Sequence, residues 1–237
     1  KVYVIEVNPR ASRTVPILSK VTNIPMVEIA VEVMLGKKIK DFHYKQDMYK
    51  YSNIYAVKMP IFSNKKLSGI DVALGPEMKS TGEVLGVDFD KDKALYKAFK
   101  ASGVKILQNG NLYISVNDID KKDSLHVIKK YEELNFNISA SSGTYKFLNE
   151  NGVKCSELSL DAAVEYIKDK KIDIVINTAT QGYNSERQGF MLRHTALAHD
   201  KIVFTCLDTA NAYIDAILTE KNGENIEYRT MGEYLGA

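Results

Sequence analysis

The sequence predicts an α/β protein in which a small parallel-sheet domain follows a region of helices and isolated strands. From Lys105 onward, short apolar runs alternate with helical patterns, as in folds whose parallel strands are joined by crossover helices. Before that point, two amphipathic helical patterns follow a short β-prone run. The 237 residues, of which 45% are hydrophobic, are enough for one large or two small cores.

Composition argues against several classes of function. A net charge of +2 gives no general affinity for polyanions, and no basic and aromatic platform for nucleic acid stands out. There is no run of 18 apolar residues, and the first residues lack a charged-then-apolar signal segment. Cys155 and Cys206 have no metal or redox spacing and are expected to be buried thiols. The sequence therefore predicts a cytoplasmic protein that binds neither nucleic acid nor membrane.

The opening stretch VIEVNPRASRT combines metal-ligand and phosphate-ligand side chains. Alternation along the β-prone run places Glu6 and Asn8 on one face, and Pro9 ends the run. A carboxylate and an amide oxygen suit Mg2+, whose remaining ligands are waters and phosphate oxygens. Arg10 and Arg13 follow three residues apart, and their guanidinium groups would pair with phosphate or carboxy-phosphate oxygens. A strand end with solvated charges remains the alternative.

The rest of the first half reads as packing elements and connections. Helical periodicity covers residues 14–36, with Pro25 at a helix start, and residues 37–53 read as a loop. A strand is expected at 55–62 and a helix at 90–102, ended by Gly103. The change of pattern places a domain boundary near this glycine.

The second half alternates between apolar strands and amphipathic helices. Helices are expected between successive strands, and a polar tail follows the last helix, which is expected to be capped by Asp208 and to run through Leu218. The expected strands are 112–116, 136–140, 153–155, 172–176 and 202–207, with one more possible at 226–228 in the tail.

A phosphate-binding turn is indicated where the strand 136–140 runs into a helix. Ser141 to Thr144 read Ser-Ser-Gly-Thr, so a glycine would let the backbone approach an anion while hydroxyls and amides donate to it. Lys121 stands near the start of the preceding helix, where a cation is poor for the helix dipole but useful beside a bound anion. Helix capping by the hydroxyls and a solvated lysine remain the alternatives.

Further candidates follow the strand 172–176. Asn177 and Thr178 lie at its carboxyl end, where ligands bind in open α/β sheets. A polar, glycine-containing loop covers residues 181–188. Arg193 falls on an amphipathic helix, where a structural role is one interpretation.

Several strings resemble the large subunit of carbamoyl-phosphate synthase. IEVNPRASRTVP followed by SK resembles the close of its second ATP-grasp domain, and LGPEMKSTGEVLG resembles the region just downstream. The segment after Lys105 is similar to its terminal regulatory domain, of the methylglyoxal-synthase-like type. The resemblance implies an α/β chain: a remnant of an ATP-grasp domain with following helices, then a small parallel-sheet α/β domain of the methylglyoxal-synthase-like type. The implied parts are 1–36, the end of the ATP-grasp domain, 37–103, a connecting region, and 104–237, the allosteric domain.

The resemblance also implies a function for the candidate residues. The intact enzyme would use ATP and Mg2+ (or Mn2+), with Glu6 and Asn8 as metal ligands and Arg10 and Arg13 beside the anionic intermediate. A small glutaminase subunit would supply ammonia to a homo-oligomeric holoenzyme in pyrimidine or arginine biosynthesis, and this chain alone would be inactive. The implied contacts of a regulatory nucleotide or phosphoribosyl pyrophosphate are Lys121, Ser141, Thr144, Asn177, Thr178, Arg187 and Arg193.

The sequence departs from that family at several positions, and two alternatives stay open. Ala56 occupies the place of an acid in ornithine-responsive members, while Gln188 and His194 replace an acid and an arginine. The second domain could itself be a lyase like methylglyoxal synthase, although only Glu157 offers a base where that family has Asp-Gln-Gln. It could also be a module that serves only subunit association.

Overall fold

The computed structural model describes residues 3–4, 10–44, 53–62, 78–178, 188–223 and 225–236. A short 3-10 helix, η1, covers Ile39–Asp41. The helices are α1 Thr14–Thr22, α2 Met26–Met34, α3 Lys91–Ala101, α4 Lys121–Glu133, α5 Ser142–Glu150, α6 Leu160–Lys168, α7 Gln188–Ala198, α8 Leu207–Lys221 and α9 Met231–Leu235. The strands are β1 Tyr55–Ile61, β2 Gly82–Asp88, β3 Asn111–Ser115, β4 Asn137–Ala140, β5 Ser156–Glu157, β6 Ile174–Asn177 and β7 Ile202–Phe204.

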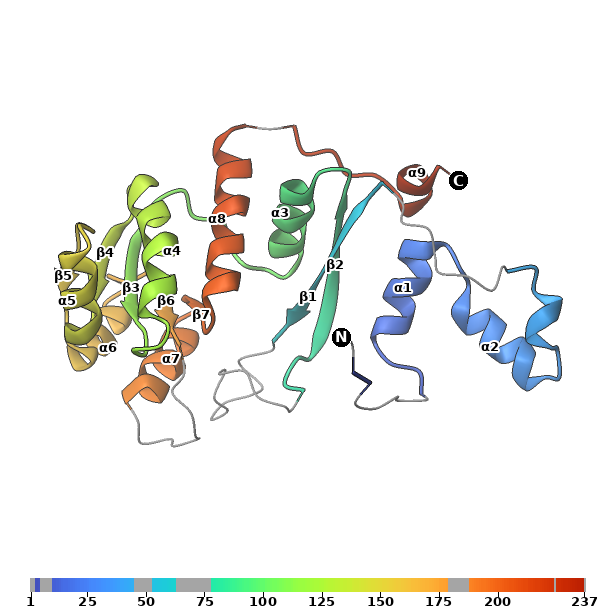
Figure 1. The fold of residues 1–237 in the computed structure, drawn as a ribbon, viewed down its shortest axis with the longest axis horizontal. Coiled ribbons are helices and arrows are strands. Elements are labelled where there is room, and N and C mark those ends of the chain that lie inside the picture. Colours follow the sequence, from blue (N-terminus) through green and yellow to red (C-terminus); the bar gives the residue numbers. More distant parts are fainter. Residues whose placement is uncertain are drawn as a thin grey trace.

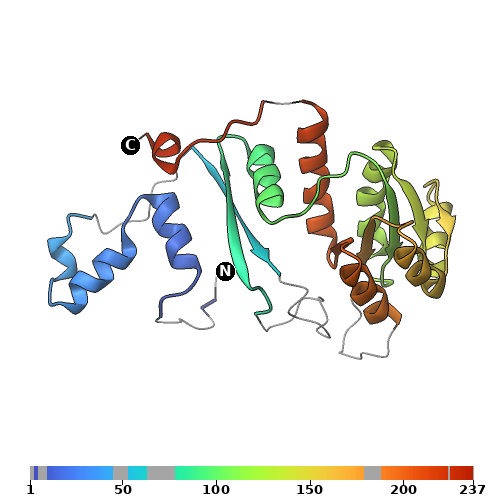
Figure 2. The same ribbon diagram turned by 180° about the vertical axis from the view of Figure 1, so that it is seen from behind.

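The molecule is elongated, with three regions in a row (Figure 1). A unit built on β3 to β7 lies at one end, and α1 and α2 lie at the other. Between them stands an antiparallel ribbon of β1 and β2 with α3 against it, and the reverse view shows the same arrangement (Figure 2). The predicted α/β class with a small parallel sheet is therefore confirmed.

The five-stranded sheet has the order β5-β4-β3-β6-β7, and every neighbouring pair is parallel. The chain starts in the central strand β3, builds outward through β4 to β5, and then returns to the other side of β3 for β6 and β7. This reversal creates a switch point between β3 and β6, and ligands in such sheets bind outside the carboxyl ends of the strands at that point.

Two apolar cores cover the two faces of this sheet. Leu112 and Ile114 of β3 pack with residues of α4, α5 and α8, whereas Tyr113 between them packs with residues of α6 and α7. The alternation follows from the two-residue period of a strand. All four residues of β6 are buried, as expected for a strand covered on both faces.

Helix α3 joins the ribbon to the five-stranded unit. Tyr96 and Phe99 belong to the same core as Tyr213 of α8. The rings of Phe99 and Tyr213 meet edge to face, with their centroids 5.4 Å apart. The Tyr213 hydroxyl accepts from the Leu107 N–H at 2.9 Å and donates to the Lys105 carbonyl at 2.7 Å. The connection after Gly103 is therefore held against α8, and apolar packing continues across the expected boundary.

The structure corrects several expected elements. The strand expected at 153–155 is wrong, because the Val153 N–H closes the end of α5 on the Leu148 carbonyl and pairing with β4 begins only at Ser156. Asp208 does not cap α8: Cys206 occupies that position, and the helix runs to Lys221. Gln188, expected in a loop, begins α7. Strand β2 was missed altogether, although it pairs with β1 along its full length.

The two helices expected in the first half are present as α1 and α2, and both are largely exposed. Pro25 stands at the start of α2, and Gly36, with φ of 104°, follows its end. Neither α1 nor α2 contains a fully buried residue. Cys155 and Cys206 are free and half-buried rather than buried. In the part of the chain that the structure describes, every helix is too short or too polar to cross a lipid bilayer.

The polar tail contains no strand within its described residues, which corrects the expectation at 226–228. Instead it crosses from α8 to the ribbon and ends in α9, a helix that the sequence did not suggest (Figure 1). The Glu227 carbonyl, which a strand would have used for pairing, accepts a hydrogen bond from Lys97 of α3. Lys97 also forms an ion pair with Asp88 of β2, at 2.6 Å.

We expect the contribution of Asp88 to stability to disappear in acid. Burial alone would raise the pKa of Asp88, but the hydrogen bond from Lys97, together with backbone N–H donors, outweighs it and holds the pKa below its usual value. A depressed carboxyl pKa stabilises the fold above the unfolded pKa of about 3.9, and this stabilisation is lost as the pH falls further. The melting temperatures of the wild type and Asp88→Asn should therefore differ most near about pH 7 and converge towards about pH 3.

Candidate functional site

The predicted effector residues lie around the carboxyl ends of three adjacent strands. Strands β3, β4 and β6 end at Ser115, Ala140 and Asn177, and the parallel registers bring these ends to one edge of the sheet. The loops that follow contain the expected Ser141 and Thr178. The site therefore stands at the switch point of the sheet.

The turn into α5 presents its first backbone amides without a side-chain cap. Ser141 occupies the N-cap position, but its hydroxyl donates to the Thr144 hydroxyl at 3.2 Å rather than accepting from the helix. A β-carbon added at Gly143 would lie 3.5 Å from the Lys121 ammonium, so this cation stands beside the helix N-terminus. Lys121 forms an ion pair with Asp118 at 2.6 Å, and the Asp118 side chain is 92% exposed. An anion at this turn would meet backbone N–H groups, the positive end of the helix dipole and an ammonium group.

Three predicted site residues hold the loop that follows β3. The Asn177 amide donates to the Ser115 carbonyl at 2.7 Å, the Thr144 hydroxyl accepts from the Val116 N–H at 3.2 Å, and the Thr178 hydroxyl accepts from the Asn117 N–H at 3.2 Å. All three side chains are buried. Their polar groups therefore position the loop beneath the site. Among the described residues, Lys121, Ser141 and the α5 amides are the groups placed to meet a ligand.

We expect Thr144→Val to destabilise the protein by about 1–3 kcal/mol. The Thr144 side chain is 1% exposed, and valine would leave the Val116 N–H without its acceptor. Urea unfolding of the purified chain measures the change. Ser142→Ala is the matched control, because Ser142 is exposed at the start of the same helix and should cost well under about 1 kcal/mol. Equal stability of the two variants would show that the Thr144 hydroxyl does not hold the loop.

Arg193 reaches the same edge of the sheet from α7. Its guanidinium donates to the Asn177 side-chain oxygen at 2.5 Å, and the residue is 6% exposed. Gly189 lies one turn earlier, where an added β-carbon would come within 3.2 Å of the Asn177 oxygen and 3.3 Å of the Arg193 guanidinium. The structure thus brings Arg193 and Asn177 together, while Arg187 lies outside the described residues.

The other candidate group lies at the far side of the ribbon. Arg13 donates to the Ser80 carbonyl at 2.9 Å and to the Ser80 hydroxyl at 3.2 Å. Lys58 of β1 forms an ion pair with Glu83 at 3.0 Å and donates to the Thr14 hydroxyl at 3.1 Å. The strings VIEVNPRASRT and LGPEMKSTGEVLG, 67 residues apart at Arg13 and Ser80, therefore meet in space.

Not all members of that group can be placed. Arg10 is exposed, whereas Glu6 and Asn8 lie outside the described residues. Within the described residues there is no cluster of three or more His, Cys, Asp or Glu side chains suited to a metal ion. The metal-ligand prediction for Glu6 and Asn8 therefore stays a prediction.

Sequence reasoning missed the residues that shape the effector site without contacting a ligand. The loop of Val116 and Asn117, and Gly189, received no role, although each is in close contact with a predicted site residue. Gly189 was the available signal, because a glycine inside a helical pattern often marks a close approach.

Comparison with known families identifies two parts of the chain. A model of the ATP-binding domain of the carbamoyl-phosphate synthase L chain matches residues 1–42, and a model of the MGS-like domain matches residues 123–205. The carbamoyl phosphate synthase large chain of Clostridium acetobutylicum is 50% identical over 235 residues, which are 99% of this chain and 22% of that protein. By sequence, the chain belongs to the carbamoyl phosphate synthase large-chain family. It joins the end of an ATP-grasp domain to an MGS-like domain.

A second carbamoyl phosphate synthase large chain is similar to this chain over nearly its whole length. The large chain of Thermoanaerobacter pseudethanolicus is 42% identical over 233 residues, which are 98% of this chain and 22% of that protein. The chain thus spans about a fifth of the length of the curated relatives it matches. Among solved structures, methylglyoxal synthase from Elizabethkingia anophelis aligns with 46% of this chain and 79% of its own, at 19% identity and a TM-score of 0.38. The MGS-like match runs from α4 to β7, and it therefore covers most of the parallel sheet.

Proposed function

We propose that this chain is the part of a glutamine-hydrolysing carbamoyl phosphate synthase large chain that completes a carbamate-phosphorylating site and binds a phosphorylated regulator. The similarity over 99% of the chain supports the first half of this proposal. The arrangement at the start of α5 supports the second, and it is the observation that carries the regulatory role. There, uncapped amides and the Lys121 ammonium converge on one turn.

The regulator is a nucleotide or sugar phosphate whose phosphate group sits at the start of α5. The phosphate would accept hydrogen bonds from the amides of Ser142 to Thr144. It would also replace the exposed Asp118 carboxylate as the ion-pair partner of Lys121. Such an exchange is favourable because an ion pair with a 92% exposed carboxylate contributes little. Asn177, Thr178 and Arg193 position the neighbouring loop, and Arg187 completes the set of cations.

The catalytic contribution comes from the opening stretch. Glu6 and Asn8 would hold Mg2+ or Mn2+, since a carboxylate and an amide oxygen are the ligand types that these ions prefer. When bound, the ion would neutralise charge on the phosphates of ATP. Arg10 and Arg13 would orient the anionic intermediate, and the contact of Arg13 with Ser80 would fix that guanidinium beside the ribbon. The rest of the ATP site would be supplied by other parts of the large chain.

The remaining context follows from the same family membership. A small glutaminase subunit supplies ammonia, the holoenzyme is a homo-oligomer in the cytoplasm, and its product enters pyrimidine or arginine biosynthesis. The domain limits we propose are 1–36, 37–103 and 104–237. This chain alone does not turn over substrate.

Calorimetric titration of the purified chain with UMP, IMP and phosphoribosyl pyrophosphate tests the regulatory role. At least one of them should bind with measurable heat and raise the melting temperature, because a ligand that binds only the folded state stabilises it. If none of the three gives heat or a melting shift, the domain serves association rather than regulation, and the proposal is wrong.

A further inference from the structure

The segment 225–236, which we name the C-terminal strap, returns from the MGS-like unit to the ribbon. It begins just after α8, passes over the end of β2 and finishes in α9 (Figures 1 and 2). Several contacts attach it, among them the hydrogen bond of Lys93 of α3 to the Asn225 carbonyl at 3.5 Å. Ile226 packs at the edge of the main core, the Tyr234 ring meets Phe89 with centroids 5.2 Å apart, and Thr230 and Glu233 form a capping box at the start of α9.

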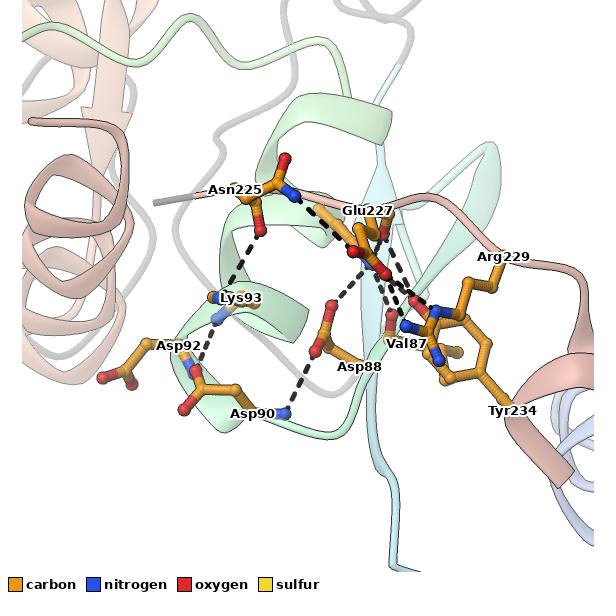
Figure 3. Close-up of polar contacts among 10 residues, drawn as sticks. Val87, Asp88, Asp90, Asp92, Lys93, Asn225, Glu227, Arg229 and Tyr234 are labelled. Atoms are coloured by element: carbon orange, nitrogen blue, oxygen red, sulfur yellow. Dashed lines mark hydrogen bonds and ion pairs between the residues drawn. The ribbon is translucent and has the colours of Figure 1, made fainter. Parts of the chain in front are cut away.

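A buried lysine, Lys97, stands at the centre of the strap's attachment. Figure 3 labels its partners, which are Val87 and Asp88 of β2 and Glu227 and Tyr234 of the strap. Lys97 is 7% exposed, and its ammonium has two acceptors on β2: the Asp88 carboxylate at 2.6 Å and the Val87 carbonyl at 3.2 Å. The strap supplies two more acceptors, the Tyr234 hydroxyl at 2.6 Å and the Glu227 carbonyl. Two of these four hydrogen-bond acceptors therefore come from residues 130 and 137 positions away in the chain.

Because the acceptors of Lys97 are shared between β2 and the strap, docking of the strap and the geometry of the ribbon depend on each other. A buried ammonium is stable only when it is paired and its hydrogens are accepted. Loss of the strap would leave the buried Lys97 ammonium with only its two acceptors on β2, Asp88 and Val87. The same ammonium holds Val87 and Asp88, which end β2. The opposite end of β2 begins two residues after Ser80, the partner of Arg13.

We propose that the C-terminal strap is a conformational latch that couples the MGS-like unit to the β1–β2 ribbon through Lys97. With the latch closed, the strap ties α8 to β2 in addition to the packing of α3 against both of them. With the latch open, the ribbon keeps its pairing but loses an anchor at Asp88. The latch gives the MGS-like unit a mechanical route to the region around Arg13. It depends on no effector, so it stands or falls separately from the proposed function.

Hydrogen exchange of the full 237-residue chain tests the latch with two matched tyrosine variants. Tyr234→Phe deletes a hydroxyl that accepts from Lys97, whereas Tyr228→Phe deletes the hydroxyl of a 74% exposed ring on the same strap. In Tyr234→Phe, the hydrogen-bonded amides of Glu233 and Tyr234 should exchange roughly tenfold faster, because hydrogen bonds to charged groups are the stronger ones. The ribbon amides of 82–88 should also exchange faster, while those of β3 and β4 should not change. Tyr228→Phe should match the wild type.

Two results would overturn the latch. Equal strap exchange in the two tyrosine variants would show that Lys97 does not anchor the strap. A freed strap with unchanged ribbon exchange would show that no coupling reaches β2. Lys97→Met should open the strap further than Tyr234→Phe, with Lys91→Met on the exposed face of α3 as its control. If Lys97→Met does not fold, the tyrosine pair still decides the question.

Discussion

Replacing Gly86 with alanine is expected to destabilise the protein by about 3 kcal/mol or more. Strand β2 packs directly against the backbone of α3 at this glycine, where an added β-carbon would lie 2.2 Å from the Ala94 carbonyl oxygen and 2.5 Å from the Ala98 amide nitrogen. Both contacts are with backbone atoms, so relief requires that α3 shift as a whole, and forced overpacking of this kind is strongly destabilising. Urea unfolding of the purified chain measures the loss.

Gly82→Ala is the matched control on the same strand. Its β-carbon would lie 3.9 Å from the Ile61 β-carbon, which is an ordinary van der Waals distance. We therefore expect a change within about 1 kcal/mol. A Gly86→Ala variant as stable as Gly82→Ala would mean that α3 does not lie on β2 as described here.

Lys121→Met is expected to weaken binding of the nucleotide or sugar phosphate identified by titration by roughly 10–100-fold. The Lys121 ammonium stands beside Gly143 at the start of α5, and hydrogen bonds that involve a charged group contribute more than neutral ones. Methionine keeps much of the length and apolar stem of lysine, so packing should be little altered. Calorimetry at fixed ionic strength measures the change in affinity.

Lys122→Met separates a local contact from a general loss of positive charge. Lys122 is the next residue along α4, is exposed, and carries the same charge. Its replacement should change affinity less than about threefold, because exposed charges are screened by salt. Similar losses in the two variants would indicate long-range attraction rather than a phosphate held by Lys121.

Local sequence signals were sufficient for elements whose type is set by periodicity and by glycine positions. Glycines at 36 and 103, with φ of 104° and 84°, end helices where the sequence predicted an end, and apolar runs at β3 and β6 lie in the parallel sheet. Tail residues 226–228 were misread because their partner is distant in the chain. The Glu227 carbonyl meets Lys97, 130 positions away, and no local pattern records that contact.

The candidate effector site also combines features that the sequence predicted with features that only the folded structure decided. The sequence identified Lys121, Ser141 and Thr144 as a group because each stands at a strand-to-helix turn of a parallel sheet, where the fold gathers such turns at one edge. It could not say which side chains face a ligand and which hold the protein. That distinction depends on burial: Thr144, Asn177 and Thr178 use their polar groups on the backbone after β3, because a buried polar group must be satisfied by the protein.

The sequence by itself determined the α/β class, the parallel unit, the types of side chain at the effector turn and the family to which the chain belongs. These are set by periodicity, glycine positions and strings of residues that are adjacent in the chain. Tertiary structure alone decided the pairing of β2 with β1, the shared core of α3 and α8, and the docking of the strap on Lys97. Each of those depends on which distant groups can bury and satisfy one another, and that is fixed only when the chain has folded.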